Sequence, residues 1–182
     1  MKRAAMTVAF VLVTGASFAQ SHPPYAGLQS RPIKALSDQQ IADLRGGRGM
    51  SMALPAELNG YPGPLHVIEH ANALALTTDQ LAHVQRLYDE MKGEAVILGE
   101  RLIAQEAELD RQFSSRTVTR PTLVETTTAI GKIQSELRAT HLRYHLLTVE
   151  VLTPAQLSRY SALRGYDDSG QEHPPHSQPH KR

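Results

Sequence analysis

Four histidines form two pairs that share one spacing. His66 and His70 lie four residues apart in LHVIEH, and His141 and His145 lie four residues apart in HLRYH. Residues four apart on a helix lie on nearly the same face, with Cβ atoms about 6 Å apart, so each pair could bind one metal ion. A single pair of this kind is also common on an ordinary helix surface. The pattern therefore predicts a metal site only if the fold brings the two pairs together.

The ligand types in the chain limit which metal ions it could bind. The sequence contains no cysteine, which leaves nitrogen, oxygen and thioether ligands. These ligands suit Ni, Co, Zn or Cu(II) better than Cu(I) or an iron–sulfur cluster. A carboxylate could add an oxygen ligand or orient an imidazole ring. We therefore expect any bound ion to be a divalent transition metal.

One motif indicates catalysis, but its context does not. His66, Glu69 and His70 match H-x-x-E-H, the inverted zinc-peptidase motif. A peptidase would need this motif on a long helix facing a substrate cleft, whereas here it lies in a short segment between prolines and a capping threonine. No Ser, His and Asp set stands out, and GGRG at 46–49 follows an expected helix rather than the strand of a phosphate loop. We expect a protein that is not an enzyme.

The first 19 residues resemble a secretory signal peptide. Lys2 and Arg3 precede an apolar run from Ala4 to Val13, and small residues follow up to Ala19. This run is too short to span a bilayer, which takes about 20 apolar residues. The chain has 19 basic and 18 acidic residues, so it lacks the basic excess of a nucleic-acid-binding protein. We predict a periplasmic protein that has no nucleic-acid partner.

Two long segments carry a helical repeat and should position the histidines. In 78–113 and 121–152, apolar residues recur alternately three and four positions apart, which is the period of packed helices. The repeat comprises Leu81, Val84, Tyr88, Met91, Ala95, Leu98, Leu102 and Leu109, then Leu123, Ile130, Ile133, Leu137, Tyr144, Leu147 and Val151. The short polar link SSRTVTR favours an antiparallel arrangement. We therefore predict an all-α fold built on an antiparallel long helical hairpin with short flanking helices.

The flanking segments have weaker signals. Capping patterns and prolines predict helices over 38–45, over 64 to about 75, and over 154 to about 164, while Pro55 predicts a broken or mobile segment over 50–64. The domain organisation that follows is a signal peptide over 1–19, a flexible lead over 20–35, a helical domain over 36–166 and a disordered His-rich tail over 167–182.

The hairpin would bring the histidine pairs to similar heights. If the chain reverses near residue 117, His141 and His145 lie level with about residues 93 and 89, and if it reverses at 76–77, His66 lies level with about residue 87. Glu90 and Glu94 lie at suitable heights as carboxylate ligands. Periodicity gives the height of a residue along a helix, but it does not give the direction in which its side chain points.

A five-residue pattern occurs twice in the chain, as LTTDQ at 76–80 and as LTPAQ at 152–156. In each copy, the threonine can cap a helix while the glutamine reaches back to the cap residue. Two copies flanking a long hairpin, behind a signal peptide and without cysteine, resemble the LTxxQ superfamily of periplasmic proteins. That superfamily includes Spy- and CpxP-like stress chaperones and CnrX- and ZraP-like heavy-metal proteins. The resemblance covers roughly 36–166 and implies a four-helix, hairpin-based protein that is often a dimer.

The resemblance also implies a ligand set. In CnrX-like nickel and cobalt sensors, the ligands are a histidine pair four apart, a glutamate from the next helix, and a histidine followed four residues later by a methionine. Carried onto this sequence, His66 and His70 match the first pair, Glu90 is the carboxylate and His141 matches the later histidine. His145 occupies the methionine position, which puts the metal preference and a sensor role in doubt.

Two functions remain open at this point. The first is a periplasmic heavy-metal-binding sensor or resistance protein with the site His66, His70, Glu90, His141 and His145. The second is an ATP-independent periplasmic chaperone of the Spy or CpxP type, because a mobile segment containing Met50 and Met52 could adapt to varied apolar clients. The expected partners are a second copy of the chain, together with a membrane-bound regulatory protein or unfolded client proteins.

Overall fold

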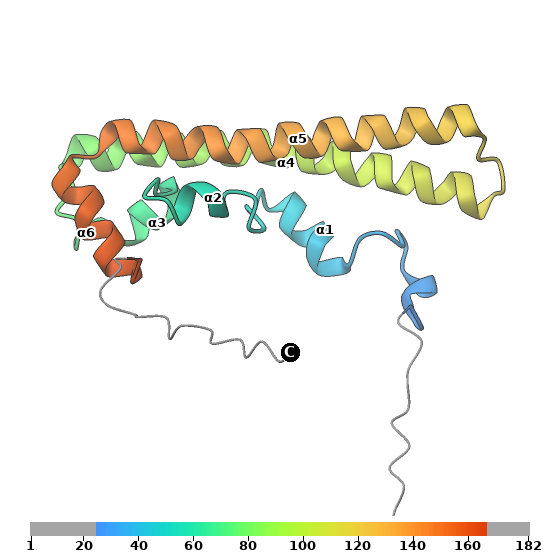
Figure 1. Ribbon diagram of the computed structural model, residues 1–182, viewed down its shortest axis with the longest axis horizontal. Coiled ribbons are helices and arrows are strands. Elements are labelled where there is room, and N and C mark those ends of the chain that lie inside the picture. Colours follow the sequence, from blue (N-terminus) through green and yellow to red (C-terminus); the bar gives the residue numbers. More distant parts are fainter. Residues whose placement is uncertain (1–24, 167–182) are drawn as a thin grey trace, which may run out of the picture.

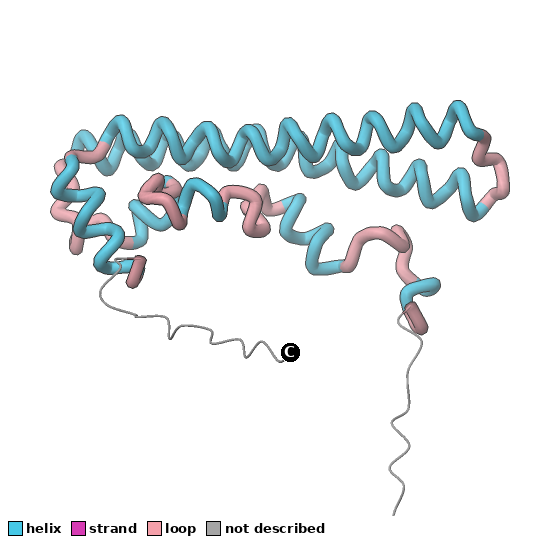
Figure 2. The backbone as a smooth tube through the Cα atoms, in the orientation of Figure 1, coloured by secondary structure: helices cyan, strands magenta, loops and turns pink. Residues whose placement is uncertain are grey.

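A computed structural model describes residues 25–166, and every regular element within them is a helix (Figure 1). The short elements are η1 (Leu28–Ser30), α1 (Asp38–Arg45), α2 (Leu54–Glu57), α3 (Pro64–Glu69) and α6 (Pro154–Arg164); the long ones are α4 (Thr78–Ser114) and α5 (Arg120–Val151). The long helices pack side by side in opposite directions, as the sequence predicts (Figures 1 and 2). The short helices follow one another along one side of this hairpin.

Capping explains why the long helices begin where the sequence predicts. The Oγ1 of Thr77 accepts the Gln80 amide at 3.1 Å, and Thr119 accepts the Thr122 amide at 3.3 Å. Pro121 lies in the first turn of α5, where its missing N–H leaves no hydrogen bond unmade. Each long helix starts within one residue of its predicted first residue, and each also ends within one residue of its predicted last residue.

The expected apolar repeat forms the hairpin core. Its buried members are Val84, Met91, Ala95 and Leu102 on α4, and Ile130, Ile133, Leu137 and Tyr144 on α5. Helix α1 adds Leu44, whose backbone lies so close to α4 that a Cβ on Gly99 would stand 2.4 Å from its carbonyl oxygen. Glycine at position 99 is therefore what allows α1 to lie directly on the long helix.

The segment before α4 differs from the expectation in two ways. The predicted break at 50–64 contains the four-residue helix α2, with Pro55 in its first turn. Helix α3 ends at Glu69 rather than near Ala75, because the chain turns through His70 and reaches Ala75 at a φ of 49°. This turn buries Leu74 beside Val84 and Tyr160 and leaves Thr77 free to cap α4.

Part of the segment predicted as a flexible lead packs on the hairpin. Ile33 is buried in the core cluster of α1 and α4, and Lys34 Nζ lies 3.0 Å from Asp110 Oδ2. The predicted signal peptide at 1–19 and the predicted tail at 167–182 lie outside the described residues. Across 25–166, no helix is long and apolar enough to cross a membrane.

The two copies of the LTxxQ pattern contact each other. Besides capping α4, Gln80 places its Nε2 3.0 Å from Gln156 Oε1, and Gln156 Nε2 lies 3.0 Å from Gln80 Oε1. Gln80 Nε2 also donates to the Val151 carbonyl at 2.9 Å, and Gln156 Nε2 donates to the Leu74 carbonyl at 3.4 Å. The two glutamines therefore cap their own helices and join the start of α4 to the start of α6.

We predict energetic coupling between these glutamines. Gln80→Ala and Gln156→Ala should each destabilise the fold, and the double variant should lose less than the sum because both single changes remove the same bonds. Denaturant unfolding followed by circular dichroism should give a coupling free energy of about 0.5–3 kcal/mol. The control combines Gln156→Ala with Gln134→Ala, which changes an exposed residue in α5. The destabilising effects of Gln156→Ala and Gln134→Ala should add. Additive effects of Gln80→Ala and Gln156→Ala would contradict the prediction.

Candidate metal centre

A pocket of about 230 Å³ lies where α2 and α3 meet α5, and two of the predicted ligands line it. Its walls are formed by Gly49, Met50, Ser51, Ala53, Leu54, Glu57, His66 and His145. The structure therefore brings His66 from α3 and His145 from α5 to one cavity, although they are 79 positions apart in the sequence.

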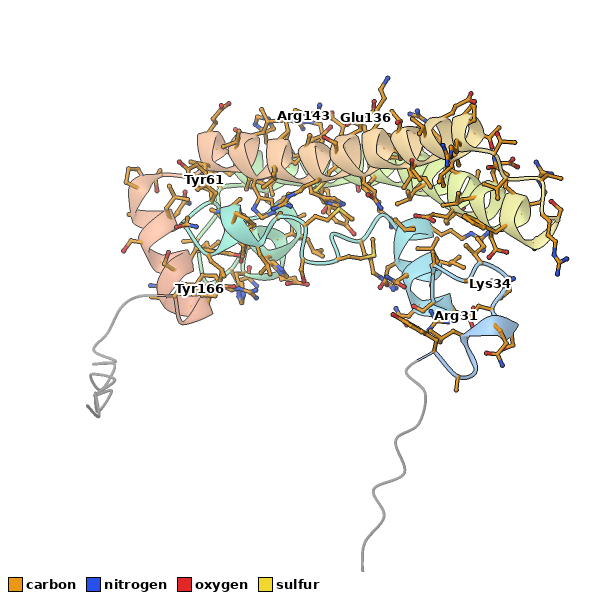
Figure 3. All side chains as sticks on the ribbon, turned by 45° about the vertical axis from the view of Figure 1, so that its right-hand side comes forward. Arg31, Lys34, Tyr61, Glu136, Arg143 and Tyr166 are labelled. Carbon is orange, nitrogen blue, oxygen red and sulfur yellow. The ribbon has the colours of Figure 1, made fainter. Side chains whose placement is uncertain are left out.

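The ring of His145 is held in one orientation. Its Nδ1 lies 2.6 Å from the carbonyl oxygen of Tyr61, which can only accept a hydrogen bond, so Nδ1 carries the proton. The neutral ring then has its free lone pair on Nε2, the form that binds metal ions. A Cβ on Gly63 would stand 2.8 Å from this Nε2, so only glycine at that position leaves room for the ring. Figure 3 labels Tyr61 close beneath the hairpin.

His66 has the same arrangement on a more exposed ring. Its Nδ1 lies 2.8 Å from Glu69 Oε2, and an ionised carboxylate accepts the Nδ1 proton. A carboxylate that holds one ring nitrogen fixes the tautomer and raises the basicity of the other, a common arrangement behind metal-binding histidines. The hydrogen bonds of the two histidines thus favour the same tautomer, in which Nε2 is the nitrogen available to a metal ion.

Glu57, a residue that the sequence interpretation missed, forms a buried wall of this pocket. Its side chain is 7% exposed and accepts hydrogen bonds from Tyr160 at 2.5 Å, Tyr166 at 3.2 Å and the Gly63 amide at 3.2 Å. Arg164 Nε lies 3.5 Å from the same carboxylate. Burial, and then the hydrogen bond to Glu57, raise the pKa of Tyr160 far above its usual value. Glu57 therefore connects the pocket to α6.

The loop over the pocket has a strained backbone. Met50 and Ser51 have φ values of 41° and 65°, a region that non-glycine residues rarely adopt. Residues held in such conformations cost on the order of 1–3 kcal/mol each and often occur at functional sites. Met50 lines the pocket, and its thioether is a ligand that soft ions accept.

His141 lies next to Gly49, the residue before Met50 in this loop, and is one helical turn before His145 on α5. Its side chain is 3% exposed, and a Cβ on Gly49 would stand 3.7 Å from its Nδ1. Its Nε2 is buried and has no hydrogen-bond partner within the described part of the chain. Burial, and then the nearby His145, lower the pKa of His141 below 6.5. The ring is therefore neutral at physiological pH.

The remaining predicted ligands lie elsewhere. The ring of His70 packs edge-on against Tyr160, with centroids 6.2 Å apart, and Glu90 is exposed on α4. Glu94 accepts a hydrogen bond from Tyr144 at 2.9 Å and pairs with Arg143. Between residues 25 and 166, no three His, Asp or Glu side chains are close enough to hold an ion together. The structure thus joins two of the five predicted ligands at one pocket.

No similar protein identifies the role of this pocket. Comparisons of the chain with family profiles, with curated proteins and with solved structures find no match. Interpretation of the pocket therefore depends on its own chemistry.

The neutral state of His141 predicts a pH effect on stability. Because the folded protein lowers the pKa of this ring, the unfolded chain binds the proton more tightly, and the free energy of unfolding should fall as pH drops below about 6.5. His141→Leu should remove this part of the decline. Urea unfolding at several pH values between about 5 and 7 measures it.

The control for this measurement is His83→Leu, on an exposed position of α4. In this variant, the free energy of unfolding should fall with pH as it does in the unmodified chain. If the free energy of unfolding of the His141→Leu variant depends on pH as steeply as that of the unmodified chain, His141 does not titrate as described.

Proposed function

We propose that this protein is a periplasmic heavy-metal-binding protein of the sensor or resistance type. In it, His66 and His145 bind a divalent ion such as Ni, Co, Zn or Cu(II). The observation that carries the proposal is the shared hydrogen-bond pattern of the two rings, since each Nδ1 is held by an oxygen acceptor and both side chains line one pocket. Borderline divalent ions bind such neutral imidazoles well. The signal peptide predicted over 1–19 supports the location.

The pocket supplies two nitrogen ligands and leaves the other coordination positions to water or to Met50. Glu57 already accepts three hydrogen bonds, so its carboxylate serves the fold first. Binding requires neutral imidazoles, so protons and the metal ion compete for the same nitrogens. His70, Glu90 and His141 stay predicted ligands that a conformational change would have to bring to the pocket. A homodimer and a membrane-bound regulatory partner stay predictions as well.

Calorimetric titration with Ni, Co, Zn and Cu(II) tests the proposal. The reference protein carries asparagine in place of His173, His176 and His180, so that these histidines do not bind the ions. His66→Ala and His145→Ala should each reduce the affinity strongly because each removes one of two nitrogen ligands. Glu69→Gln should reduce it by about tenfold, since it replaces the carboxylate that orients His66.

A matched control is His83→Ala, which removes an exposed imidazole from α4 and should leave the affinity unchanged. If His66→Ala and His145→Ala bind as tightly as the reference protein, the proposed site is wrong.

A second function, an ATP-independent chaperone, is favoured by one surface. Four large apolar residues on and beside α2 and α3 are exposed: Leu54, Leu58, Tyr61 and Leu65. Exposed apolar residues that gather in one segment often mark a contact surface for other proteins. The strained loop at Met50 and Ser51 adjoins this segment, so a small conformational change there could enlarge it.

Light scattering of a denatured client protein tests this alternative. An equimolar amount of the chain should suppress aggregation, and the double variant Leu58→Ser with Leu65→Ser should suppress it less because it removes apolar contact area. The control is Ile97→Ser, which changes an exposed apolar residue on α4 (64% exposed, against 56% for Leu58). No suppression by the unmodified chain, or an equal loss in the control, would argue against a chaperone.

A further inference from the structure

A groove of about 460 Å³ lies at the other end of the molecule, near the loop that joins α4 to α5. It is formed by the last turns of α4 and the segment before α1, and it is lined by Lys34, Ala35, Glu106, Leu109, Asp110, Phe113 and Ser114. Figure 3 labels Lys34 on that segment, below the end of the hairpin. The volume falls within the range of small-molecule sites.

The groove contains one carboxylate with which no described residue pairs. Glu106 is 9% exposed, and no hydrogen bond or ion pair of its carboxylate occurs with any described residue. The other two charged groups neutralise each other, because Lys34 Nζ lies 3.0 Å from Asp110 Oδ2 and the Lys34 amide donates to Asp110 Oδ1 at 3.3 Å. Its oxygen atoms are not among the fully buried, unpartnered polar atoms of the described residues, so the Glu106 carboxylate faces the solvent of the groove. A ligand in the groove can therefore reach this carboxylate.

The remaining walls are apolar. Leu109 and Phe113 follow Glu106 along one face of α4, three and seven residues later, and Ala35 completes the apolar lining. The exposed ring of Phe113 offers a face over which a cation can lie favourably. The groove thus combines an apolar surface with a single negative charge.

We propose that this groove is a binding site for a small hydrophobic amine, whose ammonium group pairs with Glu106 and whose hydrocarbon body covers Leu109 and Phe113. Charge complementarity selects this ligand class. An anion would face Glu106, and a neutral apolar molecule would leave the carboxylate unpartnered. The site shares no residue with the pocket of His66 and His145, so it stands independently of metal binding.

Backbone amide NMR of the full chain with three six-carbon probes tests the site. Hexylamine should bind saturably and shift amides in 33–35 and 106–114. Hexanol should bind at least about tenfold more weakly because it lacks the charge that pairs with Glu106, and hexanoate should bind more weakly still. Equal affinity for hexylamine and hexanol, absence of binding, or shifts confined to other segments would each overturn the proposal.

Glu106→Gln removes the charge while keeping the side-chain shape. It should weaken the binding of hexylamine by about tenfold and leave the binding of hexanol unchanged. Unchanged hexanol binding would also show that the groove remains folded. The control Glu125→Gln removes an exposed carboxylate from α5 and should not affect either probe. An unchanged preference for hexylamine in Glu106→Gln would contradict the proposal.

The pH dependence provides a separate readout. Burial raises the pKa of Glu106 above 4.5, so hexylamine affinity in the unmodified chain should fall as pH drops toward and through that raised value. Glu106→Gln should lack this decline even though it retains Asp110 and Lys34. The same decline in the variant would assign the effect to Asp110 and reject the role of Glu106.

Discussion

The reciprocal hydrogen bonds between Gln80 and Gln156 are the contact on which the rest of the structure depends. Each glutamine caps its own helix, and each also bonds the other across 76 positions of sequence. Because the hairpin returns the end of α5 to the start of α4, this amide pair fixes where α6 leaves the hairpin (Figure 1). Tyr160 on α6 then reaches Glu57, and Glu57 holds the segment that forms the pocket. The repeated sequence pattern thus determines the position of elements far from itself.

The pocket shows how this framework orients side chains that could bind a metal. His145 obtains its tautomer from a backbone carbonyl in the segment that Glu57 fixes, whereas His66 obtains its tautomer from a neighbour on its own short helix. The first orientation therefore depends on tertiary structure and the second on local structure. A site that combines the two is sensitive to movement of the segment between α2 and α3, because such movement would separate Tyr61 from His145 while leaving His66 and Glu69 paired.

The sequence predicts helices better than it predicts the site, for a physical reason. Capping residues and apolar spacing are local signals, and they place α1, α4, α5 and α6 within one residue of their observed limits. The pairing of His66 with His70 assumed a continuous helix, but α3 ends at Glu69, and His70 has a φ of −102° as the C-cap residue. The ring of His70 packs against Tyr160, whereas His66 lines the pocket. The part played by Glu57, Tyr61 and Gly63 depends on contacts distant in sequence, which no local pattern indicates.

Two buried glutamates at opposite ends of the hairpin illustrate how partners decide the consequence of burial. Glu57 and Glu106 are similarly inaccessible, at 7% and 9% exposure. Glu57 has two tyrosine hydroxyls, a backbone amide and a nearby guanidinium, so its desolvation is offset within the fold and its role is structural. Glu106 has none of these among the described residues, so burial raises its pKa with no partner to oppose the shift. A carboxylate that lines an open apolar groove without a partner in the described chain is matched best by a ligand that brings a positive charge.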